Sequence, residues 1–305
     1  MKQASVWGLC ALAALGACSD VPARAAPVPA PAPAPAPAPT LAAADTGAAD
    51  AAAFGALLAK HQRMSARAAR ISRALRVANA PLCADTRADL GLSVHALADY
   101  PERLRPLALH YLSLGQEGDF VRAVVPGSPA DRAGVRVGDR IVSGWPAAAD
   151  VPLVVDSGSR RFAVQADPDA ACRQPAHVVN APEPNASTNG REITLSTALL
   201  AEVGDDSALA FIIAHEMAHG LRGHERSGWR EELQADADAL VLMRNAGFDV
   251  AGTVAGWEAG VEAHRDSQRG SPTHPPLDVR LDGLRRAQAE LAVRCAIAAV
   301  CPLSD

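Results

Sequence analysis

Two histidines four residues apart, His215 and His219, enclose the glutamate Glu216 in an apolar segment of the chain. Residues four apart lie on one face of an α-helix, so both imidazoles can bind the same metal ion. A glutamate directly after the first histidine can act as a base toward a water molecule at that ion. The pattern therefore predicts a zinc-hydrolase site. The alternative is a buried helix whose histidines hydrogen-bond to neighbouring groups.

The segment around these residues has the composition of a buried helix. Residues 205–207, Asp-Asp-Ser, offer N-cap groups, and residues 208–214 are an apolar, helix-forming run. Gly220 and Gly223 offer a stop. Buried histidine and glutamate side chains need partners, and a bound zinc ion would supply them.

A catalytic zinc site needs three protein ligands and one open position. His224 lies one residue short of the place where the metzincin pattern has its third histidine. Glu232 is the better candidate, in a second amphipathic helix predicted over residues 230–246 with Gly247 as its cap. Asp236 shares the face of Glu232 and can accept the free ring N–H of a ligating histidine. The alternative is a solvated acidic helix start, which the helix dipole also favours.

Another histidine, His274, lies in the proline-rich segment 271–276. The prolines impose an extended, turning backbone and prevent a helix until about Leu277. A histidine in such a rigid loop is well placed to donate a hydrogen bond to an oxyanion. The alternative is a linker histidine before the last helix.

Together these motifs resemble the gluzincin metallopeptidases, the family that includes the CAAX prenyl proteases, the HtpX heat-shock proteases and periplasmic relatives such as BepA. The resemblance spans about residues 178–285. The segments that carry it are Val178-Val179-Asn180, Asn185-Ala186, Gly190 to Leu200, His215-Glu216-x-x-His219, Glu232-x-x-Ala235-Asp236, and Thr273-His274-Pro275 with Arg280 after it. One departure is that only twelve residues separate His219 from Glu232, where members of that family commonly carry a longer insertion.

The resemblance implies a zinc endopeptidase with one Zn²⁺ per chain and polypeptide substrates. The roles that it implies are Glu216 as the base that activates the zinc-bound water, His274 as the oxyanion donor, His215, His219 and Glu232 as zinc ligands, and Asp236 and Arg280 as residues that orient the ligands. We expect the substrate to add as a strand to an edge strand near residues 192–195. The sequence also allows another divalent metal in place of zinc, because the metal that a site binds depends partly on supply.

Residues 83–178 are predicted to form a second, β-rich module. A strand at 119–124 is followed by a turn, a short helix and a closing segment over 126–142, in a glycine pattern that resembles the permuted PDZ domains of bacterial proteases. By the same resemblance, residues 90–93, Leu-Gly-Leu-Ser, would be the carboxylate-binding loop. Residues 146–161 leave little room for the helix that completes a peptide groove. Peptide binding and a purely structural role are therefore equally open.

A long Ala-rich helix is predicted from Ala48 to Ala78. Its arginines fall on one face, which we expect to be solvated, with an anionic membrane surface as the alternative. These arginines are Arg63, Arg67, Arg70, Arg73 and Arg76. The chain as a whole has a formal net charge of −5, and nothing in it favours a nucleic-acid partner.

The N-terminus resembles a bacterial lipoprotein signal. A basic start precedes an apolar stretch at 4–17, too short to span a membrane, and Leu15-Gly16-Ala17-Cys18 would make Cys18 the lipidated residue. Ser19 favours the outer membrane in a Gram-negative host, which would place the protein on the periplasmic side. The alternative is a soluble periplasmic or secreted protein, cleaved around residues 23–26. The Ala-Pro repeat at 27–39 would form an extended tether of roughly 40 Å.

The remaining cysteines fit an exported protein. Cys10 leaves with the signal and Cys18 takes the lipid, so four cysteines allow three pairings. We favour Cys83–Cys172, at the ends of the PDZ-like module, and Cys295–Cys301, both suited to an oxidising compartment. The alternative is that these cysteines are buried free thiols.

The sequence thus predicts an α+β chain: an N-terminal helix, a β-rich PDZ-like domain, and a mainly helical zinc metallopeptidase domain with a small edge-stranded sheet. The predicted segments are a signal peptide at 1–18, an Ala/Pro-rich linker at 19–47, the helix at 48–82, the PDZ-like domain at 83–178 and the peptidase domain at 179–305. We predict a membrane-tethered endopeptidase of envelope proteins, misfolded ones included. The alternative is a non-catalytic periplasmic chaperone or assembly factor that uses the PDZ-like module, with latent or structural zinc.

Overall fold

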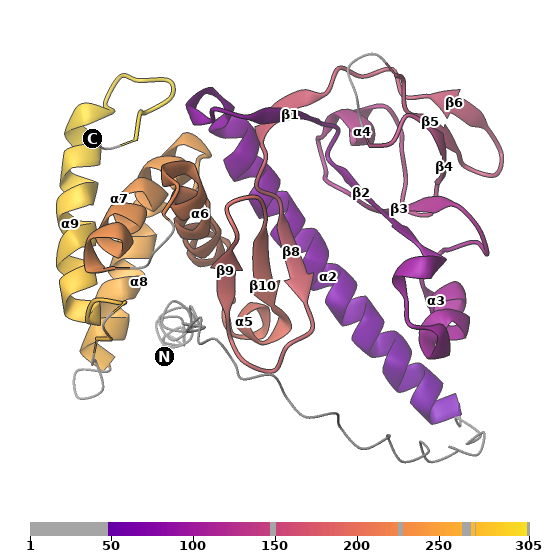
Figure 1. The fold of residues 1–305 in the computed structure, drawn as a ribbon, viewed down its shortest axis with the longest axis horizontal. Coiled ribbons are helices and arrows are strands. Elements are labelled where there is room, and N and C mark those ends of the chain that lie inside the picture. Colours follow the sequence, from indigo (N-terminus) through magenta and orange to yellow (C-terminus); the bar gives the residue numbers. More distant parts are fainter. Residues whose placement is uncertain (1–47, 147–150, 225–227, 264–269, 272, 304–305) are drawn as a thin grey trace, which may run out of the picture.

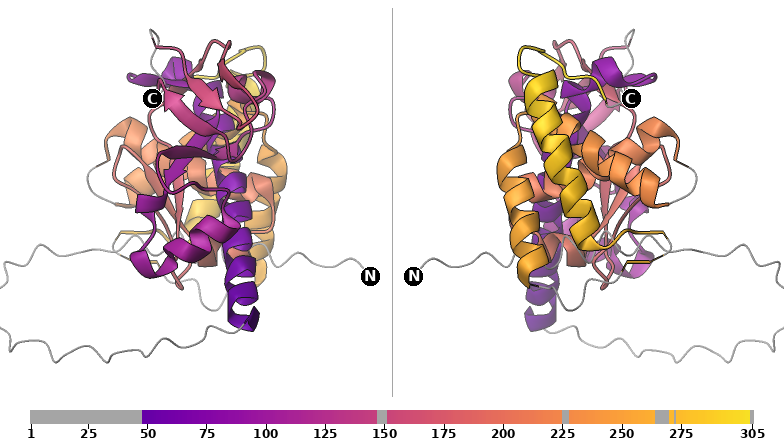
Figure 2. Two further views of the ribbon diagram at one scale, coloured as in Figure 1. Left: turned by 90° about the vertical axis from the view of Figure 1, so that its right-hand side faces the viewer. Right: turned by 90° about the vertical axis from the view of Figure 1, so that its left-hand side faces the viewer.

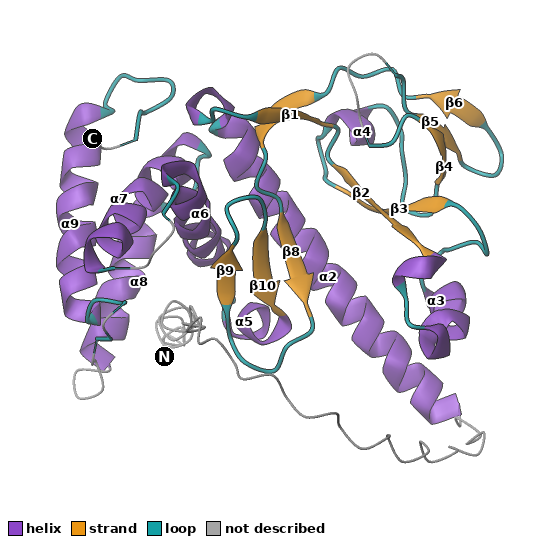
Figure 3. Cartoon of the chain, in the orientation of Figure 1, coloured by secondary structure: helices purple, strands orange, loops and turns teal. Residues whose placement is uncertain are grey.

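The computed structural model describes residues 48–146, 151–224, 228–263, 270–271 and 273–303. The predictions for the signal peptide, Cys18 and the Ala/Pro-rich linker lie outside these described residues. The chain has the predicted α+β fold, which is confirmed: a long N-terminal helix, a β-rich region, and a helical part with a small sheet (Figures 1 and 3).

A single helix, α2 (Ala48–Ala78), runs between the β-rich region and the helical part (Figure 1). The elements of the β-rich region are η1 (Ala80–Leu82), β1 (Thr86–Asp89), β2 (Leu92–Ala96), η2 (Leu97–Asp99), η3 (Glu102–Leu104), α3 (Arg105–Tyr111), β3 (Asp119–Val124), α4 (Pro129–Arg132), β4 (Arg140–Ser143), β5 (Val154–Asp156), β6 (Arg161–Ala163) and β7 (Asp169–Cys172). The elements of the rest are β8 (Ala176–Val179), β9 (Ala186–Thr188), β10 (Ile193–Ser196), α5 (Thr197–Glu202), α6 (Asp206–Arg222), α7 (Trp229–Asn245), α8 (Val250–Ala263) and α9 (Leu277–Arg294).

The β-rich region is an antiparallel five-stranded sheet in the order β2-β3-β4-β5-β6, with β1 paired separately to β7. Its own small core includes Val121, Ala130, Val135 and Val155. No helix occurs in the described stretches 133–146 and 151–175, so the helix that would complete a peptide groove is missing from them.

The loop that resembles a carboxylate-binding loop is already engaged within the chain. The Gly91 N–H donates to the Asp89 carboxylate over 2.7 Å. That carboxylate also pairs with Arg73 and Arg76 of α2, each at 3.0 Å. An internal carboxylate therefore occupies a backbone donor of this loop, and this arrangement favours a structural role for the module.

The arginine face of α2 is solvated only in part. Arg63 and Arg70 are exposed, whereas Arg67 and Arg73 are half-buried and Arg76 is buried. Arg67 and Arg70 both bind Asp206, at the start of α6, while Arg73 also binds Asp169 on β7. The other face of α2 carries Ala68, Ile71 and Leu75, which are buried in the main core. The helix is thus fastened on one side by ion pairs and on the other by apolar packing.

Three strands form the small sheet beside the helices, in the order β8-β10-β9. Strand β10 is parallel to β8 and antiparallel to β9, so it is the central strand. The expectation of an edge strand near 192–195 is therefore wrong. The edge beside α6 is β9, because the chain turns back at Gly190 and places β9 outside β10 (Figure 1). Strand β8 joins this sheet from Ala176, so the predicted domain boundary at 178/179 would divide a strand.

Local signals explain where the two central helices begin and end. The Asp205 side chain accepts hydrogen bonds from the backbone N–H groups of Ser207 and Ala208, and α6 ends at Gly223 in the left-handed conformation. Helix α7 ends just before Gly247, which also has a positive φ. Helix α9 packs against α7 and α8 on the side away from the β-rich region (Figure 2).

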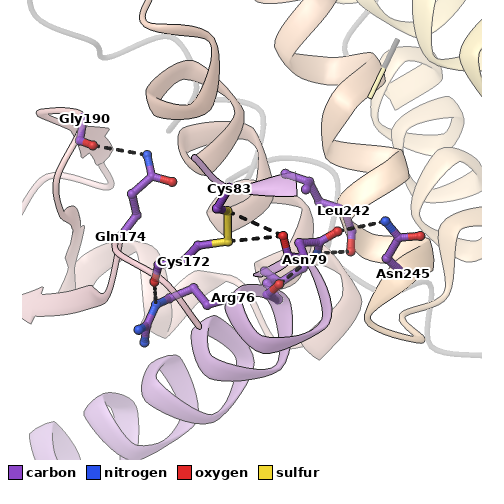
Figure 4. The surroundings of a disulfide bond; sticks show 9 residues. Arg76, Asn79, Cys83, Cys172, Gln174, Gly190, Leu242 and Asn245 are labelled. Carbon is purple, nitrogen blue, oxygen red and sulfur yellow. Dashed lines mark hydrogen bonds between the residues drawn. A yellow bond between two sulfur atoms is a disulfide. The ribbon is translucent and has the colours of Figure 1, made fainter. Parts of the chain in front are cut away.

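The four described cysteines are paired as Cys83–Cys172 and Cys295–Cys301. The first bridge lies in a polar cluster that joins three elements (Figure 4). The Asn79 side chain donates to the carbonyl of Leu242 on α7, and Arg76 donates to the carbonyl of Cys172 on β7. The end of α2 is thereby fixed to the β-rich region and to α7 at once.

Candidate metal centre

Helices α6 and α7 bring three potential metal ligands together. His215 and His219 come from α6 and Glu232 from the first turns of α7, and all three are buried. The two Nε2 atoms are 3.1 Å apart, and the Glu232 oxygens lie 3.5 Å from the Nε2 of His215 and 3.4 Å from that of His219. Three ligand atoms of this group lie within 4.8 Å of one another.

The donor set fits a zinc ion. Two imidazole nitrogens and one carboxylate are a ligand set that catalytic zinc uses, with a fourth position open. Both Glu232 oxygens are buried, and neither accepts a well-aligned hydrogen bond from the described residues. A buried carboxylate without such bonds is costly unless a cation lies beside it. Although burial raises the pKa of Glu232, His215 and His219 lower it more strongly, so the carboxylate is charged.

Behind the ligands, Asp236 orients His215. Its Oδ1 is 2.9 Å from His215 Nδ1, so the ring donates there and turns its Nε2 toward Glu232. Burial opposes protonation of the ring, but the carboxylates of Asp236 and Glu232 outweigh it and raise the pKa of His215 to about 9. Arg280 on α9 donates from Nε to Asp236 over 2.8 Å and lies over the Trp257 ring at 4.8 Å. Residues from three helices thus fix one ligand.

Glu216 is buried beside this group. Its Oε1 accepts no hydrogen bond from the described residues, which leaves the oxygen available to a reactant. Burial, with a smaller contribution from the charge of Glu232, raises the pKa of Glu216 to about 7. A carboxyl with a pKa near neutrality can both accept and release a proton at physiological pH.

His274 reaches the same centre from the loop before α9. The residue is buried, and its Nε2 is 3.8 Å from Glu232 Oε2. Its Nδ1 lies 2.9 Å from the Thr273 hydroxyl, which holds the other edge of the ring. The structure therefore brings together Glu216, His274, Asp236 and Arg280 with the three potential ligands.

Comparison with protein families gives two matches. Residues 155–230 match peptidase family M48, and residues 120–143 match the PDZ domain. The chain carries a peptidase family M48 domain. Comparison with curated proteins and with solved structures gives no significant match. Together with the His215, His219 and Glu232 group, the M48 match makes the chain a zinc metallopeptidase.

The M48 match contains both histidines and Glu216 but ends two residues before Glu232. The third ligand position in this M48 domain therefore rests on the geometry of α6 and α7. His224, the other nearby candidate, contacts the opposite side of the cluster, with its Nδ1 3.0 Å from His219 Nδ1. It thus supports His219 from behind and does not occupy the fourth position.

Sequence reasoning missed one close approach in the M48 domain. Gly220 follows His219 directly, and a Cβ there would lie 1.7 Å from Gln174 Nε2. Gln174 also donates to the carbonyl of Gly190, in the turn between β9 and β10. The sequence signal was the glycine directly after a ligand. The structure shows that Gly220 is needed because the β9–β10 hairpin packs directly onto α6.

No helix in the described residues is long and apolar enough to cross a membrane.

Proposed function

We propose that this protein is an endopeptidase of the HtpX and BepA type that binds one zinc ion per chain. Its substrates would be polypeptides of the bacterial envelope, misfolded ones included. The observation that carries the proposal is Glu216, a buried carboxylate whose Oε1 accepts no hydrogen bond from the described residues, next to a group of three potential ligands. A closed structural site would use four protein ligands and would need no base.

When bound, zinc would act as a Lewis acid that lowers the pKa of water and polarises a peptide carbonyl. His215, His219 and Glu232 would hold it, with Asp236 and Arg280 fixing the first histidine. Glu216 would accept the proton of the attacking water and pass it to the leaving amine. His274 would donate from Nε2 to the oxygen of the scissile carbonyl as negative charge develops there.

The edge strand β9 is the natural place for the substrate backbone. Ser196 N–H donates to the Asn185 carbonyl and Asn189 N–H to the Glu192 carbonyl, so 185, 187 and 189 face β10. By the alternation of an antiparallel ladder, the N–H and C=O groups of Ala186 and Thr188 point to the open edge. An extended peptide can add there as a further strand, beside the ligand helix.

The purified full-length chain is expected to contain one zinc ion and to cleave unfolded casein. Chelation by phenanthroline should stop cleavage, and added zinc should restore it. Metal analysis and gel electrophoresis measure both. A chain without zinc and without cleavage would favour the non-catalytic assembly factor instead, whereas zinc with no cleavage would point to a latent or highly selective enzyme.

The proposed location is the periplasmic side of the outer membrane, with Cys18 lipidated. The sequence of the signal and the Ala-Pro tether supports it, and two cysteine pairs suit an oxidising compartment. We expect Cys18→Ser to move the protein from the membrane fraction to the soluble periplasmic fraction. Cys10→Ser, in the signal itself, is the matched control and should leave the distribution unchanged. A membrane-bound Cys18→Ser protein would contradict the lipid anchor.

A further inference from the structure

Trp229 makes a hydrogen bond that links the two segments holding the metal centre. It is the first residue of α7, three residues before Glu232. Its indole Nε1–H donates to the carbonyl of Ser271 over 2.9 Å. Gly228, the N-cap, has no side chain to cap the helix. This bond therefore ties the start of α7 to the loop that precedes α9.

Ser271 is hydrogen-bonded to His274, and we call Ser271, Thr273 and His274 together the His274 turn. The Ser271 N–H donates to the His274 carbonyl over 2.8 Å, and the His274 N–H donates to the Ser271 hydroxyl over 3.0 Å. The Thr273 hydroxyl, inside the same turn, contacts His274 Nδ1. A shift of Ser271 must therefore shift the His274 ring, and with it the Nε2 atom 3.8 Å from Glu232.

The turn contacts the helices on both of its sides. On its C-terminal side it continues into α9, whose Arg280 is buried and bound to Asp236. On its N-terminal side, Ser271 accepts the hydrogen bond from Trp229 of α7. Trp229 is 46% exposed, so apolar burial is a weak reason for a tryptophan there. The indole N–H, which phenylalanine would lack, is the feature that its position uses.

We propose that Trp229 is a positioning residue: it latches the His274 turn to α7, so that His274 Nε2 and the ligand Glu232 keep a fixed separation. This inference rests on the proposed function insofar as His274 acts on the scissile carbonyl. The hydrogen bond of Trp229 goes to Ser271 and not to a ligand, so Trp229 would act through Ser271.

The first test is Trp229→Phe in the full chain, which keeps the ring and removes the N–H. Loss of one hydrogen bond should raise hydrogen exchange at the Ser271 and His274 amides about threefold to tenfold, with zinc present or removed. Trp145→Phe makes the same chemical change in the β-rich region and should leave these amides unchanged. Because exchange needs no turnover, this arm tests the latch even if the chain cleaves nothing. Unchanged exchange in Trp229→Phe would overturn the proposal.

The second test uses cleavage and asks whether Trp229 acts through His274. We expect Trp229→Phe to lower kcat about tenfold, with KM and zinc content unchanged. In a His274→Ala background the same substitution should have no further effect on kcat. Equal losses in both backgrounds would mean that Trp229 does not work through His274. A raised KM with unchanged kcat would instead make the indole a substrate contact.

Discussion

Glu216→Gln is expected to keep its zinc and to lose essentially all peptide-bond hydrolysis. Glutamine has nearly the same shape as glutamic acid, so the packing around α6 and the two histidine ligands should persist. An amide cannot accept a proton at neutral pH, and Glu216 is the buried carboxyl beside the ligand group. Since general base catalysis contributes about 10²–10⁴ in rate, we expect kcat to fall at least about 10²-fold. Metal analysis and cleavage of a quenched fluorescent peptide measure both quantities.

Glu231→Gln is the matched control, because it makes the same change one residue from a ligand and should retain both zinc and activity. The pH profile offers a second check. The carboxylate form must be present for turnover, so the wild-type rate should fall as the pH drops through the pKa of Glu216. Burial and the Glu232 charge raise that pKa to about 7, and a bound cation would bring it back down. A pure Glu216→Gln protein with wild-type turnover would mean that another residue is the base.

The centre could be predicted from the sequence because its geometry is mostly local. The spacing of His215 and His219 is that of one helical turn, and the same spacing places Asp236 on the face of Glu232. Helical periodicity therefore fixed which side chains could meet, once α6 and α7 were assumed to pack. The M48 match agrees with the first of these helices but ends at residue 230.

The sheet order could not be predicted in the same way. Alternation along residues 192–196 indicates a strand, but strand neighbours depend on contacts between distant segments. Strand β10 has β8 on one side and β9 on the other, so the open edge beside α6 is β9, Ala186–Thr188, and not the predicted strand at 192–195. The edge that a substrate would use is consequently one strand closer to α6 than the sequence suggested.

The arginines of α2 show a similar limit. Their regular spacing gives a charged face, and such a face is usually solvated when nothing is known of its surroundings. Their partners Asp89, Asp169 and Asp206 come from three separate segments, which only the folded chain brings together. Pairs of this kind orient α2 between the β-rich region and the M48 domain.

The second large effect is expected at Glu232, where the geometry stands without support from the family match. Glu232→Ala should lose zinc from the purified protein, because two histidines alone bind zinc far more weakly than a three-ligand set. The loss of zinc binding should also be visible in thermal unfolding. A ligand at 100 times its Kd stabilises the folded state by about 2.7 kcal/mol, so chelation should lower the Tm of the wild type but leave that of Glu232→Ala unchanged.

The comparison between zinc-free proteins separates ligation from folding. In the zinc-free wild type, Glu232 is a buried carboxylate 3.4 and 3.5 Å from two histidine nitrogens, without a well-aligned hydrogen bond. Because these histidines stabilise the charged carboxylate more strongly than burial penalises it, zinc-free Glu232→Ala should be less stable than the zinc-free wild type, while its Tm should still not respond to chelator. Glu231→Ala should retain the metal and the response to chelator. Full zinc occupancy in Glu232→Ala would show that a different side chain completes the site, and His274, 3.8 Å from Glu232, would then be the first to replace.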